Sequence, residues 1–519
     1  MKKIFRAIPL IFVLSAFGFG MTVEATTQSP TVKIANGLVF GYASGNVWIF
    51  KGVPFAAPPV GDLRWKPPQP PKDWNGVLEC KSWPASAMQA KPGPFMMWTE
   101  EFIAPPEPLS EDCLYLNLWT AAQLPGKKYP VMVWIHGGGF TGGAGSCAVY
   151  DGEEMAKQDI VFVTINYRLG VFGFLALPEL AAESPMKVSG NLGFLDQIAA
   201  LEWIRKNIAA FGGDPNNVTI LGQSAGSMSV NALMASPLAK GLFHKAILQS
   251  GGLFSNRMMK TMADGEKSGL AFMERAKATN LAELRRMSAE DIQKAASGMG
   301  FGGFGPVQDG KVIPTGLVDY FKAGRQNDVP VMSGWVTGDG ALFGPPSGNV
   351  ESFVKLAKDR YGDKAAEFLK LFPADNSEQC KASQKKLSLI SFAVMSSHDV
   401  ALFGKHKAYL YQFSHVPPDK PGFPNYGAFH TSEVPYALHT LHLWNRPWTP
   451  GDLELERIMS GYWANFARTG NPNGKGLPKW QNFDQKSSCV QELDNPISSK
   501  PALYARELEF LERQTPVNR

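Results

Sequence analysis

A serine between two glycines follows a short apolar run near the middle of the chain and could act as a nucleophile. The run, Val218–Leu221, is typical of a buried strand, and the next residues are Gly222-Gln223-Ser224-Ala225-Gly226. A serine on a sharp strand-to-helix turn has a strained backbone, so the residues two positions away must lack side chains. The N-terminus of the following helix favours developing negative charge. An ordinary Gly-Ser turn after a strand is the alternative, and only the rest of the chain can decide.

A glycine run upstream could provide the hydrogen-bond donors that such a serine needs. A serine hydroxyl is a weak nucleophile until a base removes its proton, and the resulting oxyanion must be stabilised. Gly137-Gly138-Gly139 follows the apolar run Pro130–Ile135, which predicts a strand. Glycines leave backbone N–H groups unobstructed. Two of these N–H groups and that of Ala225 are predicted to bind the oxyanion; a flexible turn is the alternative.

One of the eight histidines is the candidate base. His430 lies in the stretch Gly427–Glu433 (GAFHTSE), which we expect to be a loop entering a helix. His136 belongs to the glycine run. The remaining histidines lie in helical or strand contexts and are predicted to be structural: His244, His398, His406, His415, His439 and His442.

The candidate acid is Asp339, in the triplet Gly338-Asp339-Gly340 after a strand predicted at 329–335. Active-site groups in α/β folds lie in loops at the C-terminal ends of strands. A Gly-Asp-Gly triplet is also a common turn. The chain order Ser224, Asp339, His430 is nevertheless that of α/β-hydrolases, so we predict that the three form a catalytic triad.

Alternating strands and helices must position these residues. Apolar runs predict strands at 130–135, 160–165, 218–221, 246–249, 329–333 and 408–413, and apolar spacing of three to four residues predicts a helix over 196–211. Strands joined by helical crossovers imply a mostly parallel sheet. The predicted fold class is α/β, an α/β-hydrolase fold with helices flanking the sheet. Residues 26–519 are predicted to form one catalytic domain with helical inserts at about 254–330 and 344–404, and the C-terminal part to be a helix followed by loops.

Nearly the whole chain resembles the type-B carboxylesterase family, which includes cholinesterases, bile-salt-activated lipase and bacterial p-nitrobenzyl esterases. The resemblance rests on the His136–Phe140 run (HGGGF), the His430 loop and five longer stretches: Phe50–Trp65, Ser110–Trp119 (SEDCLYLNLW), Asn166–Phe174 (NYRLGVFGF), Gly212–Gly226 and Gly461–Trp480. It implies that Ser224 is the nucleophile, His430 the base, and Gly138, Gly139 and Ala225 the oxyanion donors. It also implies that Ser250 supports the triad by hydrogen bonding.

The sequence departs from the family pattern at three places. The family usually has Glu at the position of Asp339 and Glu at the position of Gln223. The neutral amide of Gln223 removes a negative charge near the substrate, which should weaken a preference for cationic esters. The family's first N-terminal cysteine would fall near Ala87, yet the nearest cysteine here is Cys80. A Cys80–Cys113 disulfide is therefore possible; the other three cysteines cannot be paired by inspection.

The loop at 91–110 has an apolar tip, Met96-Met97-Trp98, which either packs back on the core or lines a substrate entrance. With the segments 254–310 and 341–390, this loop is expected to shape the substrate pocket. The sequence alone leaves the ester substrate open.

The N-terminus has the pattern of a signal peptide. Lys2, Lys3 and Arg6 precede an apolar run over 7–19, and small residues around Ala25 predict cleavage before Thr26. The alternative is a membrane anchor, but the run is short for a span of about 20 residues. We therefore expect a secreted or periplasmic protein without stable membrane insertion after cleavage.

Composition is that of a globular protein, with 44% hydrophobic and 19% charged residues and a formal net charge of +5. No long Lys/Arg block occurs, so we expect no nucleic-acid partner. No cysteine pair has metal-ligand spacing, and the predicted reaction needs neither a metal nor a cofactor. The sequence thus predicts an exported serine esterase that acts on a small-molecule ester through an acyl-enzyme. A catalytically silent binding module and an acyltransferase with the same triad are the alternatives.

Overall fold

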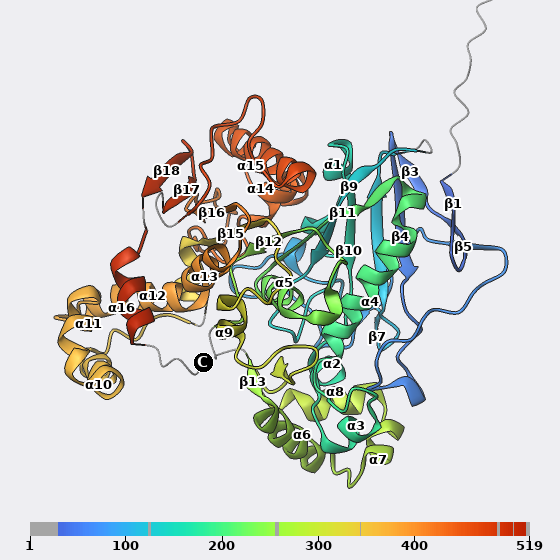
Figure 1. Ribbon diagram of the computed structural model, residues 1–519, viewed down its shortest axis with the longest axis horizontal. Helices are drawn as coiled ribbons and strands as arrows, with labels where there is room; N and C mark the ends of the chain where they lie inside the picture. The colour runs from blue at the N-terminus through green and yellow to red at the C-terminus, as the bar shows by residue number, and fades with distance from the viewer. Residues whose placement is uncertain are drawn as a thin grey trace, which may run out of the picture.

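An 11-stranded mixed sheet runs through the middle of the molecule (Figure 1). The structure is a computed structural model that describes residues 30–514, apart from 123–125, 255–258, 301, 343, 485–487 and 502. The predicted signal peptide lies outside the described residues. In spatial order the strands are β18 (Ser498–Pro501), β17 (Cys489–Leu493), β16 (Ala408–Phe413), β15 (Val331–Val336), β12 (Lys245–Gln249), β11 (Gly213–Gln223), β9 (Tyr129–Ile135), β10 (Val161–Ile165), β8 (Tyr115–Thr120), β4 (Val47–Pro54) and β3 (Tyr42–Ser44).

The centre of the sheet is parallel, from β10 through β9, β11, β12, β15 and β16 to β17, and antiparallel strands extend both edges. The predicted mostly parallel sheet is confirmed, and each apolar run predicted as a strand forms one. The prediction of loops after the C-terminal helix is wrong, because β17 pairs with β16 and β18 pairs with β17. The short strand pairs outside this sheet are β1 (Thr31–Ile34), β2 (Gly37–Phe40), β5 (Val77–Glu79), β6 (Ser86–Ala87), β7 (Leu109–Ser110), β13 (Lys260–Thr261) and β14 (Val307–Gln308).

Helices pack on both faces of the sheet. One face carries α4 (Leu192–Asn207), α5 (Ala225–Ala235) and α13 (Met395–Phe403), and the other carries α1 (Glu153–Lys157), α14 (Val434–Leu438) and α15 (Pro450–Thr469). The helix predicted over 196–211 is α4 followed by a 3₁₀ turn at Ile208–Phe211, which Gly212 ends with a φ of 77°. The remaining α-helices are α2 (Gly170–Phe174), α3 (Pro178–Glu183), α6 (Met262–Ala276), α7 (Leu281–Arg286), α8 (Ala289–Ser297), α9 (Leu317–Lys322), α10 (Val350–Tyr361), α11 (Ala365–Leu371), α12 (Ser377–Leu389) and α16 (Ala505–Arg513).

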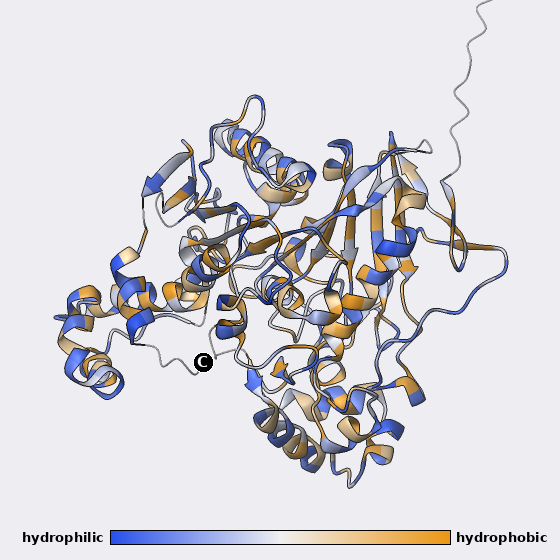
Figure 2. Ribbon diagram, in the orientation of Figure 1, coloured by the Kyte–Doolittle hydropathy of each residue, from blue (hydrophilic) through white to orange (hydrophobic). Residues whose placement is uncertain are grey.

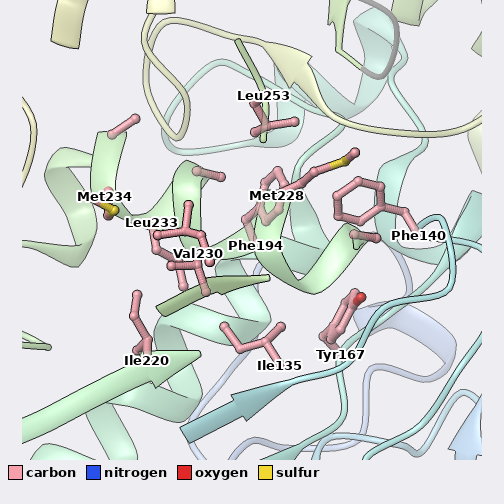
Figure 3. Packing of buried hydrophobic residues seen from close by; sticks show 14 of the residues in the cluster. Ile135, Phe140, Tyr167, Phe194, Ile220, Met228, Val230, Leu233, Met234 and Leu253 are labelled. Carbon is pink, nitrogen blue, oxygen red and sulfur yellow. The ribbon is translucent and has the colours of Figure 1, made fainter. Parts of the chain in front are cut away.

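The two-sided core explains why the central strands are apolar at every position. Side chains of a strand alternate between faces, so a strand covered on both sides has no solvent-facing position. On β9, Val131, Val133 and Ile135 join one buried cluster, while Met132 and Trp134 join the other. Figure 2 shows this apolar character along the central strands. In Figure 3, Ile135 and Ile220 project from adjacent strands toward Val230 and Met228 on α5.

The helical inserts lie between consecutive sheet strands. Helices α6 to α9 come between β12 and β15, and α10 to α13 come between β15 and β16. Among the described residues, one helical segment, Ser377–Phe403, is long and apolar enough to cross a membrane by composition alone. Because 67% of its most apolar window is buried inside the protein, the segment has the character of a core helix.

The cysteines do not form the possible disulfide between Cys80 and Cys113. All five cysteines are free and buried. The backbone of Cys80 is held between β2 and β4 by hydrogen bonds to Phe40 and Lys51. The Cys113 side chain instead lies beside the buried ion pair between Arg168 and Asp196. The possible Cys80–Cys113 disulfide is therefore not formed, although both side chains lie in the same buried cluster.

Candidate active site

Ser224 occupies a strained turn between β11 and α5. Its φ of 58° and ψ of −123° are rare for a residue with a side chain. A Cβ on Gly226 would lie 1.9 Å from the carbonyl oxygen of Ile135, and a Cβ on Gly222 would lie 2.5 Å from the carbonyl carbon of Gly226. The two glycines are therefore required by the close approach of β9 to the turn. The geometry is that of the predicted strand-to-helix turn and excludes an ordinary surface loop.

The glycine run after β9 lies directly against this turn. A Cβ on Gly137 would lie 3.1 Å from the Cβ of Ser224. Gly138 and Gly139 have positive φ values of 106° and 61°, and the carbonyl of Gly138 accepts hydrogen bonds from the N–H groups of Thr141 and Gly142. Ala225 is the first residue of α5, so its N–H has no acceptor within the helix. Among the described residues, the N–H groups of Gly138, Gly139 and Ala225 have no acceptor, which leaves them available to an anion.

His430 and Asp339 form a short buried hydrogen bond. The Nδ1 atom of His430 lies 2.6 Å from Oδ1 of Asp339, and the two side chains are 2% and 0% exposed. The other carboxylate oxygen of Asp339, Oδ2, accepts the N–H of Val336 at 2.9 Å. Asp339 lies in the 3₁₀ turn η6 (Thr337–Ala341), directly after β15. The carboxylate is thus held by its own backbone and directed at the imidazole.

The imidazole also contacts Gln223. The side-chain Nε2 of Gln223 lies 3.1 Å from Nε2 and 3.3 Å from Nδ1 of His430. Ser224 Oγ makes no hydrogen bond to His430 in the described part of the chain. Ser224 and His430 do line the same cavity. The structure therefore brings the histidine and the acid into contact, and places the serine next to them without a direct bond.

The shared cavity has a volume of about 770 Å³. Its walls are mostly apolar. Among the described lining residues, the ionisable side chains are those of Lys91, His430, Cys147 and Tyr150, and of these Lys91 is formally charged. The apolar part of the lining includes Phe95, Met96, Trp98, Phe102, Ile103, Ala104, Met228, Leu342 and Phe392. Of the apolar loop tip, Met97 packs into the core while Met96 and Trp98 line the cavity, so both alternatives for this loop hold in part.

Ser250 does not make the hydrogen bond that the family resemblance implied. Among the described residues its buried hydroxyl has no hydrogen-bond partner, and its backbone N–H donates to the carbonyl of Gly334 at 2.9 Å. Its φ of 54° shows that the residue occupies a tight turn at the end of β12.

Glu433 is a buried acid near the site that the sequence analysis missed. Its position three residues after His430 is the one signal that could have indicated it. Its side chain is 0% exposed, and Oε1 accepts the amide of Gln249 at 3.2 Å. Burial, together with the nearby charge of Asp339, raises the pKa of Glu433 to about 8. Glu433 is therefore protonated at neutral pH, which spares Asp339 a second negative charge in the same region.

The buried His136 is bound to the glycine run, as expected. Its Nδ1 lies 2.8 Å from the carbonyl oxygen of Gly137, and its ring stacks on Tyr167 with a centroid distance of 4.5 Å. Burial lowers the pKa of His136 to about 4, so the ring is neutral. Among the described residues, no group of three or more His, Cys, Asp or Glu side chains could hold a metal ion.

The model of the carboxylesterase family matches residues 28–511. The chain belongs to the carboxylesterase family. It is accordingly a carboxylic-ester hydrolase with the α/β-hydrolase fold.

Individual relatives cover nearly the whole chain. A fumonisin B1 esterase of Sphingopyxis macrogoltabida is 34% identical, covering 93% of this chain and 90% of its own length. A para-nitrobenzyl esterase of Bacillus subtilis is 36% identical, with coverages of 91% and 95%. The solved structure of a carboxylesterase of Geobacillus stearothermophilus superposes with a TM-score of 0.81 at 32% identity, covering 92% of this chain and 99% of that one.

Proposed function

We propose that this esterase works through an acyl-enzyme formed on Ser224, with His430 as the base and Asp339 as the acid that orients it. The observation that carries the proposal is the 2.6 Å bond between His430 and Asp339 in a cavity that also holds a strained serine. Asp339 holds Nδ1 of His430 in its protonated form, which leaves Nε2 free to accept a proton.

In the first half-reaction, the Ser224 oxygen bonds to the ester carbonyl carbon while its proton moves to Nε2 of His430. The carbonyl oxygen becomes an oxyanion, which the N–H groups of Gly138, Gly139 and Ala225 bind; one such donor is typically worth about 10²–10³ in rate. The carbon–oxygen bond to the alcohol then breaks, and the imidazolium protonates the leaving alcohol. Water, deprotonated by the same imidazole, releases the acid and regenerates Ser224.

The substrates that fit this cavity best are neutral esters with a large apolar group. Its walls are mostly aromatic and aliphatic, and Gln223 presents an amide where a carboxylate would attract a cation. Apolar surface buried on binding is worth about 25 cal/mol per Å². The neutral walls therefore favour apolar esters over esters of charged alcohols.

We also propose that the protein is exported. The basic residues Lys2, Lys3 and Arg6, the apolar run over 7–19 and the small residues around Ala25 support a cleaved signal peptide. Edman sequencing of the mature protein tests this. A mature N-terminus at Thr26 is expected, and an N-terminus at Met1 on protein recovered from the cytoplasm would contradict it.

The assignment of Ser224 is tested with Ser224→Ala. We expect the variant to fold, to lose nearly all turnover of p-nitrophenyl esters and to lose labelling by an organophosphonate. The exposed Ser297 on α8 provides the control, and Ser297→Ala should keep both properties. Substantial turnover by folded Ser224→Ala would refute the nucleophile.

A further inference from the structure

One cavity-lining segment, residues 89–98, is bonded to two loops of the site at its opposite ends. At one end the amide of Gln89 exchanges hydrogen bonds with the backbone of Gly143, next to the glycine run, at 2.9 Å in each direction. At the other end, Phe95 and Trp98 form a tight turn with mutual backbone hydrogen bonds of 3.1 and 3.0 Å. The segment thus ends in a turn whose indole reaches the histidine loop.

The indole of Trp98 is bonded to the residue after the histidine. Its Nε1 donates to Oγ1 of Thr431 at 2.7 Å. The hydroxyl of Thr431 in turn donates to the carbonyl oxygen of His430. The Trp98 and His430 rings also meet edge to face, with centroids 6.4 Å apart and planes at 88°. A chain of two hydrogen bonds therefore runs from the indole to the backbone of His430.

The backbone at Thr431 needs such support. Its φ of 83° lies in the left-handed region, where a β-branched residue is a genuine outlier that persists only if its surroundings hold it. Such strain costs on the order of 1–3 kcal/mol. The hydroxyl of Thr431, bonded on both sides, is placed to hold this conformation, and the conformation sets the direction from which the His430 side chain enters the cavity.

We propose that Trp98 is a positioning residue for His430 and acts through the hydroxyl of Thr431. The inference rests on the proposed function, in which His430 is the base. When the Trp98–Thr431 bond is lost, the strained backbone relaxes and the imidazole shifts within the cavity that it shares with Ser224. The acid Asp339 holds only one side of the ring, at Nδ1, so it cannot prevent this rotation by itself.

The location of Trp98 makes the bond sensitive to the substrate. Trp98 lines the cavity beside the exposed Phe95 and Met96, whereas its neighbour Met97 packs into the core. An apolar ester group in the cavity covers the indole and excludes water from its hydrogen bond, which strengthens the bond. Because the bond positions the base and does not hold the substrate, its loss should lower kcat more than it raises KM.

The test uses Trp98→Phe, which keeps the ring and removes the N–H, and Thr431→Val, which keeps the shape and removes the hydroxyl. kcat is measured per active site, counted by p-nitrophenol released from a p-nitrophenyl phosphonate. Each variant should lower kcat about 3- to 10-fold, as expected for one hydrogen bond. The double variant should be no slower than Thr431→Val, because that change already removes the bond that is lost in Trp98→Phe. Thr431→Ser, which restores the hydroxyl, should recover most of kcat.

Two control variants remove similar hydrogen bonds far from the cavity. Trp74→Phe removes an indole bond to the carbonyl of Leu38, and Thr120→Val removes a hydroxyl bond to the carbonyl of Phe211. Both should lower thermal stability and leave kcat per site unchanged.

The proposal is overturned if Thr431→Val keeps the wild-type kcat, if Thr431→Ser is as slow as Thr431→Val, or if the two single effects multiply in the double variant. None of these outcomes refutes the proposed nucleophile, which is refuted by substantial turnover in the folded Ser224→Ala variant.

Discussion

The side-chain amide of Gln223 lies 3.1 Å from Nε2 of His430, the ring atom that accepts the proton of Ser224 in the proposed mechanism. The residue before the proposed nucleophile thus also contacts the proposed base. An amide in this position can form a hydrogen bond with the imidazole without placing a charge beside it. The carboxylate that contacts the His430 ring is therefore that of Asp339.

Gln223→Glu should raise kcat/KM for esters of cationic alcohols relative to neutral esters of the same size by about tenfold, because a partly screened charge pair at ~5 Å is worth on the order of 1–3 kcal/mol. The new carboxylate also favours the imidazolium, so the acid limb of the pH–rate profile should move to higher pH. Paired substrates and a pH series measure both effects. Gln223→Met is the uncharged control, and equal ratios in both variants would contradict the role of charge.

Asp339→Asn should reduce kcat/KM by about 10⁴-fold while leaving the fold intact. Asparagine can still accept the N–H of Val336, but its amide N–H₂ would face Nδ1 of His430 and favour the wrong tautomer. Asp339→Glu should be intermediate, because the longer arm must fit a fully buried site.

The control for Asp339→Asn is Asp309→Asn. Asp309 accepts backbone N–H groups of residues 311, 312 and 313 and lies outside the catalytic cavity. It should lower thermal stability without a comparable fall in kcat per active site. A loss below tenfold in Asp339→Asn would exclude Asp339 as the orienting acid.

Glu433→Gln should make the protein more stable at alkaline pH. The pKa of Glu433 is about 8 in the folded protein, above its ordinary value of 4.5. The stabilisation from protonated Glu433 is therefore fully present below pH 4.5 and is lost as pH rises to about 8. In this range the unfolded chain is stabilised by ionising the carboxyl, whereas the folded protein keeps it protonated. Glutamine does not ionise, so the variant should not lose this stability as pH rises. Its free energy of unfolding relative to the wild type should increase by on the order of 1–3 kcal/mol between pH 4–5 and pH 8–9.

Chemical denaturation across pH 4–9 measures the effect of Glu433→Gln, with Glu290→Gln on the exposed face of α8 as the control. The variant and the wild type should converge at low pH. Parallel stability curves over the whole range would show that Glu433 ionises normally.

Gly226→Ala should destabilise the protein by about 1–3 kcal/mol or more, since its Cβ would overlap the carbonyl oxygen of Ile135 at 1.9 Å. Separating β9 from the turn would also displace Ser224, so activity per folded molecule should fall. Gly93→Ala is the control, because its Cβ would meet nothing within 4 Å. Its stability should stay within about 0.5 kcal/mol of the wild type in thermal and denaturant unfolding. A fully stable Gly226→Ala variant would contradict the packing of the turn against β9.

Local signals in the sequence determined the central sheet and the residues that carry the proposed chemistry. Apolar runs predicted strands β9, β10, β11, β12, β15 and β16, because a strand buried on both faces has no polar position. The glycines at 222 and 226 predicted the strained serine, because only they tolerate the approach of β9. The C-terminal strands β17 and β18 escaped prediction, because five and four residues of mixed polarity carry no clear period.

Only the tertiary structure decided which side chains meet. Asp339 and His430 are 91 residues apart in the chain, Gln249 and Glu433 are 184 apart, and Trp98 and Thr431 are 333 apart. The same packing left Cys80 and Cys113 unpaired and, among the described residues, left the Ser250 hydroxyl without its expected partner. The physical reason is that strain and burial patterns depend on a few neighbouring residues, whereas a distance between remote side chains depends on how every intervening strand and helix packs.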